Sequence, residues 1–255
     1  MQESVCSKCA KKVVFCNCLI TDTSISATKT GSGSDFCNSS INSDSFTSPL
    51  FETLSELSDN VSCNYFDIDS FNSSFFNAQG LSFFHLNISS LPKHQDDLSF
   101  FLDSLSVKFK VMGFSETRIV EGSSVIHNIN IPGYACLSNP TESSAGGTAL
   151  YIDKSLNYTS RTDLSSFLYY SKSLESTFAE LHLKNLPNTT IASIYKHPSF
   201  SAVSFNLLLS SVLDKINKEG KNLVLLGDFN LNLLEFESDS SVRKLDETLM
   251  YLQIH

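Results

Sequence analysis

Residues 222–230, Asn-Leu-Val-Leu-Leu-Gly-Asp-Phe-Asn (NLVLLGDFN), form an apolar run that ends abruptly in polar residues. The four apolar residues 223–226 are too few for a helix and are bounded by turn signals, so they predict a strand buried on both faces. Gly227 lets the backbone bend, and Asp228 and Asn230 then point to the same side of an extended chain. We expect a carboxylate and a carboxamide at the mouth of a sheet, one accepting hydrogen bonds or a metal and the other donating to an anion. The alternative is an ordinary Asp/Asn turn after a core strand.

Other predicted strands also end in polar residues. The polar ends are Asn87 after residues 81–86, Glu116 after residues 110–114, and Tyr195 at the end of residues 190–195. Residues 94–109 carry apolar side chains at the spacing of one helix face, and a strand, a helix and a strand in succession place both strand tips at one edge of a sheet. We therefore expect these polar ends to converge with Asp228 and Asn230. The carboxyl groups of Glu116 and Asp228 should lie within about 10 Å, the span of one hydrated magnesium ion and one phosphate.

The remaining pattern indicates the class of fold. Further strands are predicted for residues 133–138, 146–152 and 177–183, and further helices for residues 202–218 and 241–252. Strands in runs with helices outside them suggest an α/β (α+β) protein with two stacked sheets flanked by helices.

The composition limits how the chain can meet its partners. The chain has 255 residues, 41% of them hydrophobic, and a formal net charge of −9 at pH 7. Such an acidic body is not expected of a protein that holds nucleic acid by phosphate neutralisation alone. A nuclease needs only a local basic rim around its site, which Arg118 and Lys196 could supply.

The sequence predicts neither a membrane span nor a secretory signal peptide. No apolar run approaches the roughly 18 to 20 residues of a membrane span, and the N-terminus lacks the apolar region of a signal peptide. We expect no membrane partner and an intracellular protein, nuclear or cytoplasmic rather than secreted. The seven cysteines are then expected to be reduced thiols or metal ligands rather than disulfides.

Short motifs recur in a fixed order along the second part of the chain. They are LNISSL at 86–91, GFSETR at 113–118, IPGY at 131–134, GGTALYI at 146–152, IYKHPS at 194–199 and GDFN at 227–230. This order resembles the endonuclease/exonuclease/phosphatase superfamily and, within it, the apurinic-type endonuclease domain of non-LTR retrotransposons. The resemblance covers about residues 81–255 and implies a four-layer αββα sandwich of two mixed sheets flanked by helices.

The resemblance also implies roles for the polar strand ends. The residue matching Glu116 binds a divalent metal, Mg²⁺ or Mn²⁺, and the residue matching Asp228 acts on the attacking water or the leaving group. Asn230 and Asn87 would donate amide hydrogens to phosphate oxygens or hold the metal shell, and Tyr195 would contact the phosphate. Each of these residues also has a plain structural interpretation, as a capped turn or a strand end.

Phosphodiester hydrolysis is the activity that the resemblance implies. The main hypothesis is a magnesium-dependent endonuclease that nicks target DNA as a transient substrate, with a reverse transcriptase domain as partner in the intact element. The alternatives are a truncated, catalytically inactive retroelement remnant, or a phosphatase of the same superfamily that acts on lipid or sugar phosphates.

The chain also departs from the superfamily pattern. Ser89 stands where apurinic-site repair enzymes often have a second acidic residue, and His197-Pro198 stands where many relatives have Pro followed by Asn. The superfamily closes its site with an Asp and an Asp-His pair after the GDFN motif, whereas this sequence stops at His255. We therefore expect a C-terminally incomplete domain with weak or no nicking activity.

Residues 1–80 differ from the rest of the chain. Related mobile elements often place a zinc finger before the endonuclease, and Cys6, Cys9, Cys16 and Cys18 in residues 1–30 could supply four thiolates to zinc. The second pair is Cys-x-Cys, only six residues separate the pairs and no His follows within residues 1–30, so a degraded remnant without zinc is the favoured interpretation.

The segment that follows the cysteines is poor in periodic apolar residues. Residues 31–80 are rich in Ser and Asn and are expected to form a mostly disordered linker, with mobility extending over residues 21–60. Residues 61–71 are the exception, because their aromatic side chains are numerous enough to dock on the domain formed by residues 81–255.

Overall fold

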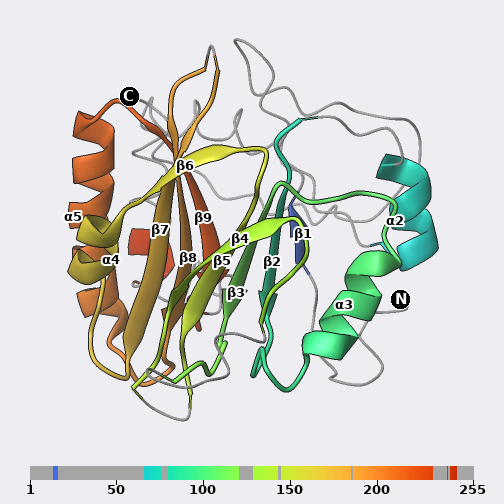
Figure 1. Cartoon of the computed structure of the whole chain (residues 1–255). Helices are drawn as coiled ribbons and strands as arrows, with labels where there is room; N and C mark the ends of the chain where they lie inside the picture. Colours follow the sequence, from blue (N-terminus) through green and yellow to red (C-terminus); the bar gives the residue numbers. More distant parts are fainter. Residues whose placement is uncertain are drawn as a thin grey trace, which may run out of the picture.

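Two β-sheets lie face to face between two pairs of helices (Figure 1). This computed structural model describes residues 14–16, 66–75, 80–120, 129–142, 145–184, 186–231, 240 and 242–245. Its layers follow the order helix, sheet, sheet, helix, so the expected αββα sandwich with two mixed sheets is confirmed.

The first sheet has five strands in the order β1-β2-β3-β5-β4. They are β1 (Val14–Cys16), β2 (Phe83–Asn87), β3 (Val111–Ser115), β4 (Tyr134–Asn139) and β5 (Thr148–Asp153). Only β2 and β3 pair in parallel, through the predicted strand-helix-strand unit, and the other pairs are antiparallel. The carboxyl ends of β2 and β3 therefore lie at the same edge, which is the lower edge in Figure 1.

The second sheet has four strands in the order β6-β7-β8-β9. They are β6 (Asn157–Ser160), β7 (Leu174–His182), β8 (Thr189–Lys196) and β9 (Asn222–Asp228). Strands β8 and β9 run in parallel, with Tyr195 opposite Asp228 in the last register position. Their carboxyl ends reach the same lower edge as those of β2 and β3 (Figure 1).

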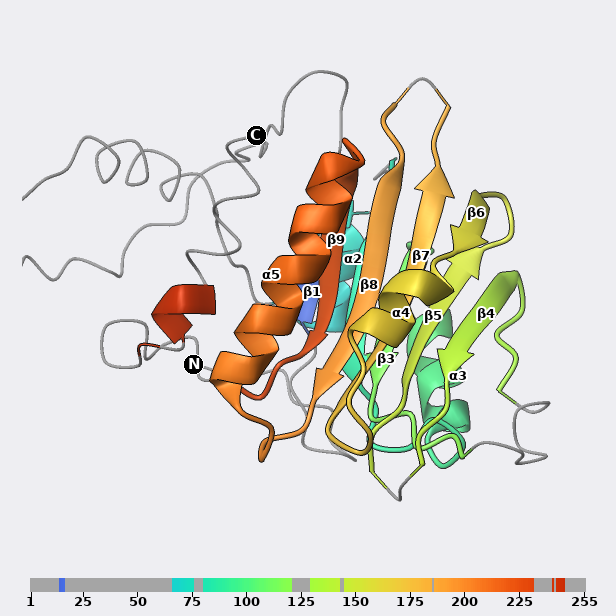
Figure 2. The same ribbon diagram turned by 90° about the vertical axis from the view of Figure 1, so that its left-hand side faces the viewer.

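Helices cover the outer face of each sheet (Figure 2). The helices are α2 (Ile68–Phe75) and α3 (Gln95–Asp103) on the first sheet, and α4 (Thr162–Phe167) and α5 (Ala202–Lys218) on the second. Helix α5 begins where the Ser201 side chain accepts a hydrogen bond from the Ser204 N–H, and Gly220, at φ +64°, follows its end. None of the described helices is long and apolar enough to cross a membrane.

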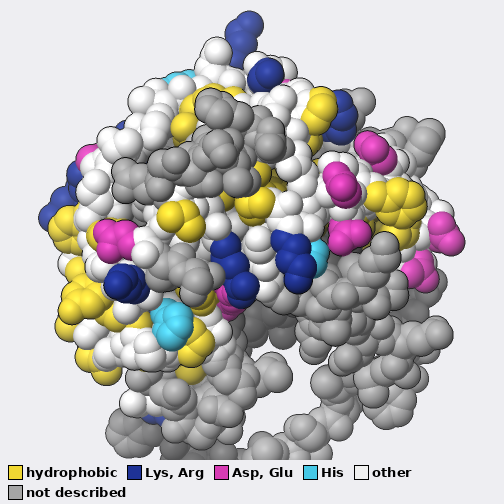
Figure 3. Space-filling model, turned by 60° about the horizontal axis from the view of Figure 1, so that its bottom comes forward, with side chains coloured by type: hydrophobic (Ala, Val, Ile, Leu, Met, Phe, Trp, Pro, Cys, Tyr) yellow, Lys and Arg dark blue, Asp and Glu magenta, His cyan; other side chains and the backbone are white. Residues whose placement is uncertain are grey.

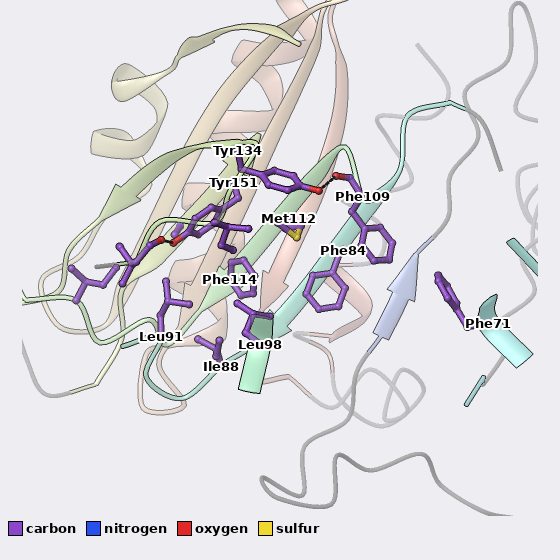
Figure 4. Close-up of a cluster of buried hydrophobic side chains, with 14 residues drawn as sticks. Phe71, Phe84, Ile88, Leu91, Leu98, Phe109, Met112, Phe114, Tyr134 and Tyr151 are labelled. Atoms are coloured by element: carbon purple, nitrogen blue, oxygen red, sulfur yellow. Dashed lines mark hydrogen bonds between the residues drawn. The ribbon is translucent and has the colours of Figure 1, made fainter. Parts of the chain in front are cut away.

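Three apolar cores fill the spaces between the four layers. The core beneath α2 and α3 contains Phe84, Phe114 and Tyr151, with Tyr134 donating its hydroxyl hydrogen to Phe109 O and Tyr151 to Ile129 O, both at 2.6 Å (Figure 4). A second core lies between the two sheets, and a third lies beneath α4 and α5. The middle core joins Phe83 and Val111 of the first sheet to Ile191 and Leu226 of the second, so the two sheets pack as one unit.

The observed elements mostly match the expected ones, with local differences. The helix expected over residues 94–109 ends at Asp103, and β5 begins at Thr148 because Gly146 and Gly147 adopt φ of +102° and +85°. Strand β6, helix α4 and the helical form of α2 were not predicted. The docking expected for residues 61–71 is confirmed in its described part, because Phe71 is buried in the core beneath α2.

Strand β9 is less buried than its apolar sequence suggests. Leu223 and Leu225 face the core beneath α5, and Val224 and Leu226 face the core between the sheets, so both faces are covered as expected. Only Leu226 is fully buried, however. In the described part of the sheet β9 pairs with β8 alone, so most of its other residues are only partly buried although both of its faces are covered.

Several expectations fall on residues outside the described part of the chain. These are the zinc site of Cys6, Cys9 and Cys18, most of the linker over residues 21–80, and His255. The backbone of Cys16 ends β1, but its side chain is also outside the described set. Residues 240 and 242–245 are helical, within or next to the helix expected over residues 241–252.

Candidate active site

The Asn87 side chain connects the carboxylates of Glu116 and Asp228. Its Nδ2 donates hydrogen bonds to Glu116 Oε1 and Asp228 Oδ2, each at 2.7 Å. Because both oxygens contact the same nitrogen, they lie at most twice that distance apart. The expected convergence of these three residues is confirmed, while their roles in a reaction stay a prediction.

The backbone around the site adopts uncommon conformations. Among the described non-glycine residues, positive φ angles occur at Lys172 and, around the site, at Ser89, Ser90, Glu116, Arg118 and Asn230. Left-handed conformations of this kind cost about 1–3 kcal/mol each and cluster at functional sites. The Ser90 N–H donates to Glu116 O at 2.8 Å, and the Leu91 N–H donates to Thr117 O at 2.9 Å. The loop that follows β2 and the loop that follows β3 therefore hold each other in place.

Glu175 supports this loop from the second sheet, and the sequence analysis missed it. Its side chain is buried, and its Oε2 accepts a hydrogen bond from the Gly147 N–H. Gly147 O and Gly146 O in turn accept hydrogen bonds from the Thr117 and Arg118 N–H groups. A Cβ on Gly146 would lie 2.4 Å from Glu175 Oε2, so only glycine fits there. The sequence carried no clear signal for it, because Glu175 stands among polar residues just before the strand predicted for residues 177–183.

Tyr195 lies at the carboxyl end of β8, opposite Asp228 on one side and Glu175 on the other. Burial, together with the negative charges of Glu116 and Asp228, raises the pKa of Tyr195 to about 12. The phenol therefore keeps its proton at neutral pH. A protonated phenol at this edge is able to donate a hydrogen bond to a phosphate oxygen.

Asn230 fixes Asp228 and joins the ends of β8 and β9. Its backbone N–H donates to Asp228 Oδ1 at 3.0 Å, and its Nδ2 donates to Lys196 O at 2.7 Å. The φ of +46° at Asn230 is tolerated by an Asn better than by most residues. The contacts support a positioning role, and donation from Asn230 to a phosphate stays a prediction.

The two expected basic residues lie in different environments. Arg118 donates from Nη2 to Glu116 Oε2 at 3.2 Å and to Ser89 Oγ at 3.3 Å, and its side chain is 40% exposed, as expected for a basic rim. Lys196 is only 1% exposed, so its expected place on that rim is wrong. The reason is strand alternation: Lys196 follows the inward Tyr195, and its partner Leu174 belongs to the core beneath α4 and α5. Burial lowers the pKa of Lys196, although the charge of Asp228 opposes this effect.

Buried polar atoms without partners lie next to the site. His85 precedes Asn87 by two residues on β2, and its Nε2 has no hydrogen-bond partner among the described residues. Burial lowers the pKa of His85 to about 4, against the opposing effect of Asp228, so its ring is neutral at pH 7. Ser115 Oγ and Thr117 Oγ1 are buried and unpaired in the same way. Such atoms beside a polar edge are typical of groups that bind water, ions or substrate.

The residues present fit a hydrated divalent cation. Two carboxylates held next to one another repel, and a cation between them relieves that repulsion. Mg²⁺ takes one or two carboxylates and keeps several waters, whereas the described residues contain no group of three His, Cys, Asp or Glu side chains suited to a metal. Asn87 presents Nδ2 to both carboxylates, so a ligand role for it would require the amide to turn and offer Oδ1.

The face that carries this edge is electrically mixed. Figure 3 shows cationic, anionic and hydrophobic side chains side by side over the lower face of the molecule. A mixed face agrees with the acidic overall composition. It also agrees with a site that binds its substrate locally rather than through one large basic surface.

Stacked mixed sheets with outer helices and a polar site at the shared strand ends define an αββα sandwich. No protein-family model matches the chain, and no curated protein matches it. Solved structures resemble its fold, among them the endonuclease domain of TRAS1, a telomere-specific non-LTR retrotransposon, with a TM-score of 0.47, 14% identity, and coverage of 67% of this chain and 69% of that chain.

Two further solved structures show the breadth of this likeness. The AP endonuclease LMAP from Leishmania major has a TM-score of 0.48 and 15% identity, and the match covers 67% of this chain and 66% of that chain. ANGEL2, a 2′,3′-cyclic phosphatase, has a TM-score of 0.41 and 17% identity, with coverage of 62% and 56%. These similarities describe the fold, so the function is argued from the site.

Proposed function

We propose that the chain is a divalent-metal-dependent phosphodiesterase that nicks DNA in the manner of a retrotransposon endonuclease. The observation that carries the proposal is the bridge from Asn87 Nδ2 to both Glu116 and Asp228, which brings one carboxylate from each sheet to one edge. Such a pair of carboxylates beside a protonated phenol is suited to phosphate chemistry.

Each residue has a defined task in this proposal. A bound Mg²⁺ or Mn²⁺, held mainly by Glu116, would supply positive charge to the phosphate oxygens. Asp228 accepts a proton from the attacking water, whose oxygen forms a new bond to phosphorus. Tyr195 donates a hydrogen bond to a non-bridging oxygen, while Asn87 and Asn230 keep the carboxylates in place.

The products of this reaction suit the proposed biological role. The bond between phosphorus and the 3′ oxygen breaks, the leaving oxygen takes up a proton, and the strand is left with a 3′ hydroxyl and a 5′ phosphate. A 3′ hydroxyl is the primer end that a reverse transcriptase extends, so such a domain is the proposed partner in the intact element. The LNISSL and IYKHPS motifs support the retrotransposon branch over a phosphatase.

Metal binding and nicking test the proposal separately. Glu116→Gln should weaken Mn²⁺ binding by about 10- to 100-fold and abolish metal-dependent nicking of supercoiled DNA. Asp214→Asn, a matched change of an exposed carboxylate on α5, should alter neither. Equal Mn²⁺ affinity in the wild type and Glu116→Gln would overturn the assigned site.

The same assay distinguishes the alternatives. Release of inorganic phosphate from sugar or lipid monoesters, without nicking, would favour a phosphatase. Mn²⁺ binding that depends on Glu116 but accompanies no turnover on either substrate would favour a protein that has kept the site without the activity.

A further inference from the structure

Two aromatic side chains, the exposed Tyr170 and the half-buried Phe200, contact each other near the candidate site. Tyr170, in the loop between α4 and β7, is 59% exposed, and its ring lies against Phe200, in the loop between β8 and α5, with 5.3 Å between ring centroids and an interplanar angle of 39°. We refer to Tyr170 and Phe200 as the aromatic rim. Most of the Tyr170 side chain is in contact with solvent, so its ring is accessible to a ligand.

The loop that carries Tyr170 is held firmly. Glu142 accepts hydrogen bonds from the Tyr169 hydroxyl at 2.9 Å and from Ser171 Oγ at 2.7 Å. The Tyr170 N–H donates to Leu174 O at 2.8 Å, which closes the loop on itself. These hydrogen bonds hold the loop on both sides of Tyr170, so little ordering of the loop is needed when a ligand binds.

The aromatic rim adjoins the candidate active site. The His197 N–H donates to Ser173 O at 2.8 Å, so the loop before β7 and the loop after β8 are hydrogen-bonded to each other. The Phe200 N–H donates to His197 O at 2.9 Å, which forms a turn that carries Phe200. His197 lies two residues past Tyr195, which is roughly 7 Å at the rise of a strand. A polymer whose phosphate contacts Tyr195 is long enough to extend over the rim, whereas a small phosphate monoester is not.

We propose that the aromatic rim stacks against an unpaired base of the DNA strand whose phosphate occupies the site. The proposal rests on the proposed function and narrows its substrate class to a nucleic acid that is single-stranded or locally unpaired beside the cut. Flat aromatic rings bind the faces of bases without regard to sequence. Lys172, at the exposed tip of the same loop, adds a cation for the neighbouring phosphate.

The absence of tryptophan from the sequence makes this contact directly measurable. Tyr170→Trp places a single tryptophan in the rim, and Phe100→Trp places one on α3, over the opposite sheet, where Phe100 is 79% exposed. In buffer without divalent cations, single-stranded oligothymidylate should quench the fluorescence of Tyr170→Trp and leave Phe100→Trp unchanged. A single strand that lacks bases should quench neither.

Binding measurements complete the test. Tyr170→Ala and Phe200→Ala should each weaken binding of the single strand by about tenfold, whereas Phe100→Ala should not. Unquenched tryptophan at position 170, or an equal loss of affinity in Phe100→Ala, would overturn the rim proposal. Mn²⁺ binding by the wild type and the same variants tests the proposed function independently. If none of these proteins binds Mn²⁺, the active-site assignment fails and the rim proposal is still judged by the quenching experiment.

Discussion

Asn87 shows how one neutral side chain organises two charged ones. Its amide lies where the two carboxylates would otherwise meet, and it donates to both of them. The bond therefore holds Glu116 and Asp228 in a geometry that repulsion alone would open. Glu175 has an indirect positioning role. It accepts a hydrogen bond from Gly147, and Gly147 in turn holds the loop that contains Glu116.

Replacement of Glu175 should separate its acceptor role from its charge. Glu175→Ala leaves the buried Gly147 N–H without its acceptor, which should cost about 1–3 kcal/mol of unfolding free energy and weaken Mn²⁺ binding as the Glu116 loop relaxes. Glu175→Gln keeps an acceptor oxygen of the same shape and should preserve both. Urea denaturation and Mn²⁺ titration measure these effects, and equal losses in the two variants would contradict the positioning role.

The unfolding free energies of the wild type and Glu175→Gln should depend differently on pH. Burial raises the pKa of Glu175, so the folded state holds this proton more tightly than the unfolded state. The stability contribution is present at low pH and is lost as pH rises above 4.5, the ordinary value, through the raised pKa. Glu175→Gln cannot titrate, so its unfolding free energy should gain on that of the wild type over this window. A constant difference across pH would show that the carboxyl group is not perturbed.

At the scale of elements, the pairing of β9 with β8 brings Asp228 opposite Tyr195, and Gly227 makes this pairing possible. A Cβ on Gly227 would lie 2.3 Å from Ile194 O and 3.0 Å from Ile194 N and C, all of them backbone atoms that cannot move aside independently.

Gly227→Ala should therefore cost about 3 kcal/mol or more of unfolding free energy and should abolish Mn²⁺ binding, because the end of β9 must shift. Gly220→Ala is the matched control. Gly220 also has a positive φ, but a Cβ there would meet nothing within 4 Å, so only the backbone cost of about 1 kcal/mol is expected. Similar losses in both variants, measured by urea denaturation, would contradict a steric role for Gly227.

The site elements could be predicted from sequence because each is an apolar run that ends in a polar residue. That pattern located the ends of β2, β3, β8 and β9 and the convergence of Asn87, Glu116 and Asp228. Strand β6 and helix α4 were not predicted, since they are short and carry few apolar residues. The burial of Lys196 was missed for a different reason: which face of a strand is covered depends on helices distant in sequence.

At the scale of the whole molecule, polarity changes along the space between the two sheets. At one end this space is filled by the apolar middle core, which includes Phe83, Val111 and Ile191. At the other end, next to the candidate site, it contains buried polar residues such as Ser115 and Glu175. The apolar end fixes the distance between the sheets, and the polar end uses that distance to place one carboxylate from each sheet.

The contact between Gly113 and Leu226 sets the spacing of the sheets close to the site, and it permits a double-mutant test. A Cβ on Gly113 would lie 3.0 Å from Leu226 Cδ1, so Gly113→Ala should push β3 from β9 and cost about 1–3 kcal/mol of unfolding free energy. Mn²⁺ affinity should fall with it, because Glu116 follows β3 and Asp228 ends β9. Leu226→Ala removes the obstructing side chain at its own cost of about 2–5 kcal/mol.

In the double variant Gly113→Ala/Leu226→Ala, the new methyl group occupies part of the vacated space. The combined loss of stability should therefore be smaller than the sum of the single losses by about 1 kcal/mol, and Mn²⁺ affinity should recover toward that of Leu226→Ala alone. Ile216→Ala provides the control, because Ile216 belongs to the core beneath α5 and should add to Gly113→Ala without coupling. Strict additivity of Gly113→Ala with Leu226→Ala would mean that this contact does not set the distance between the carboxylates.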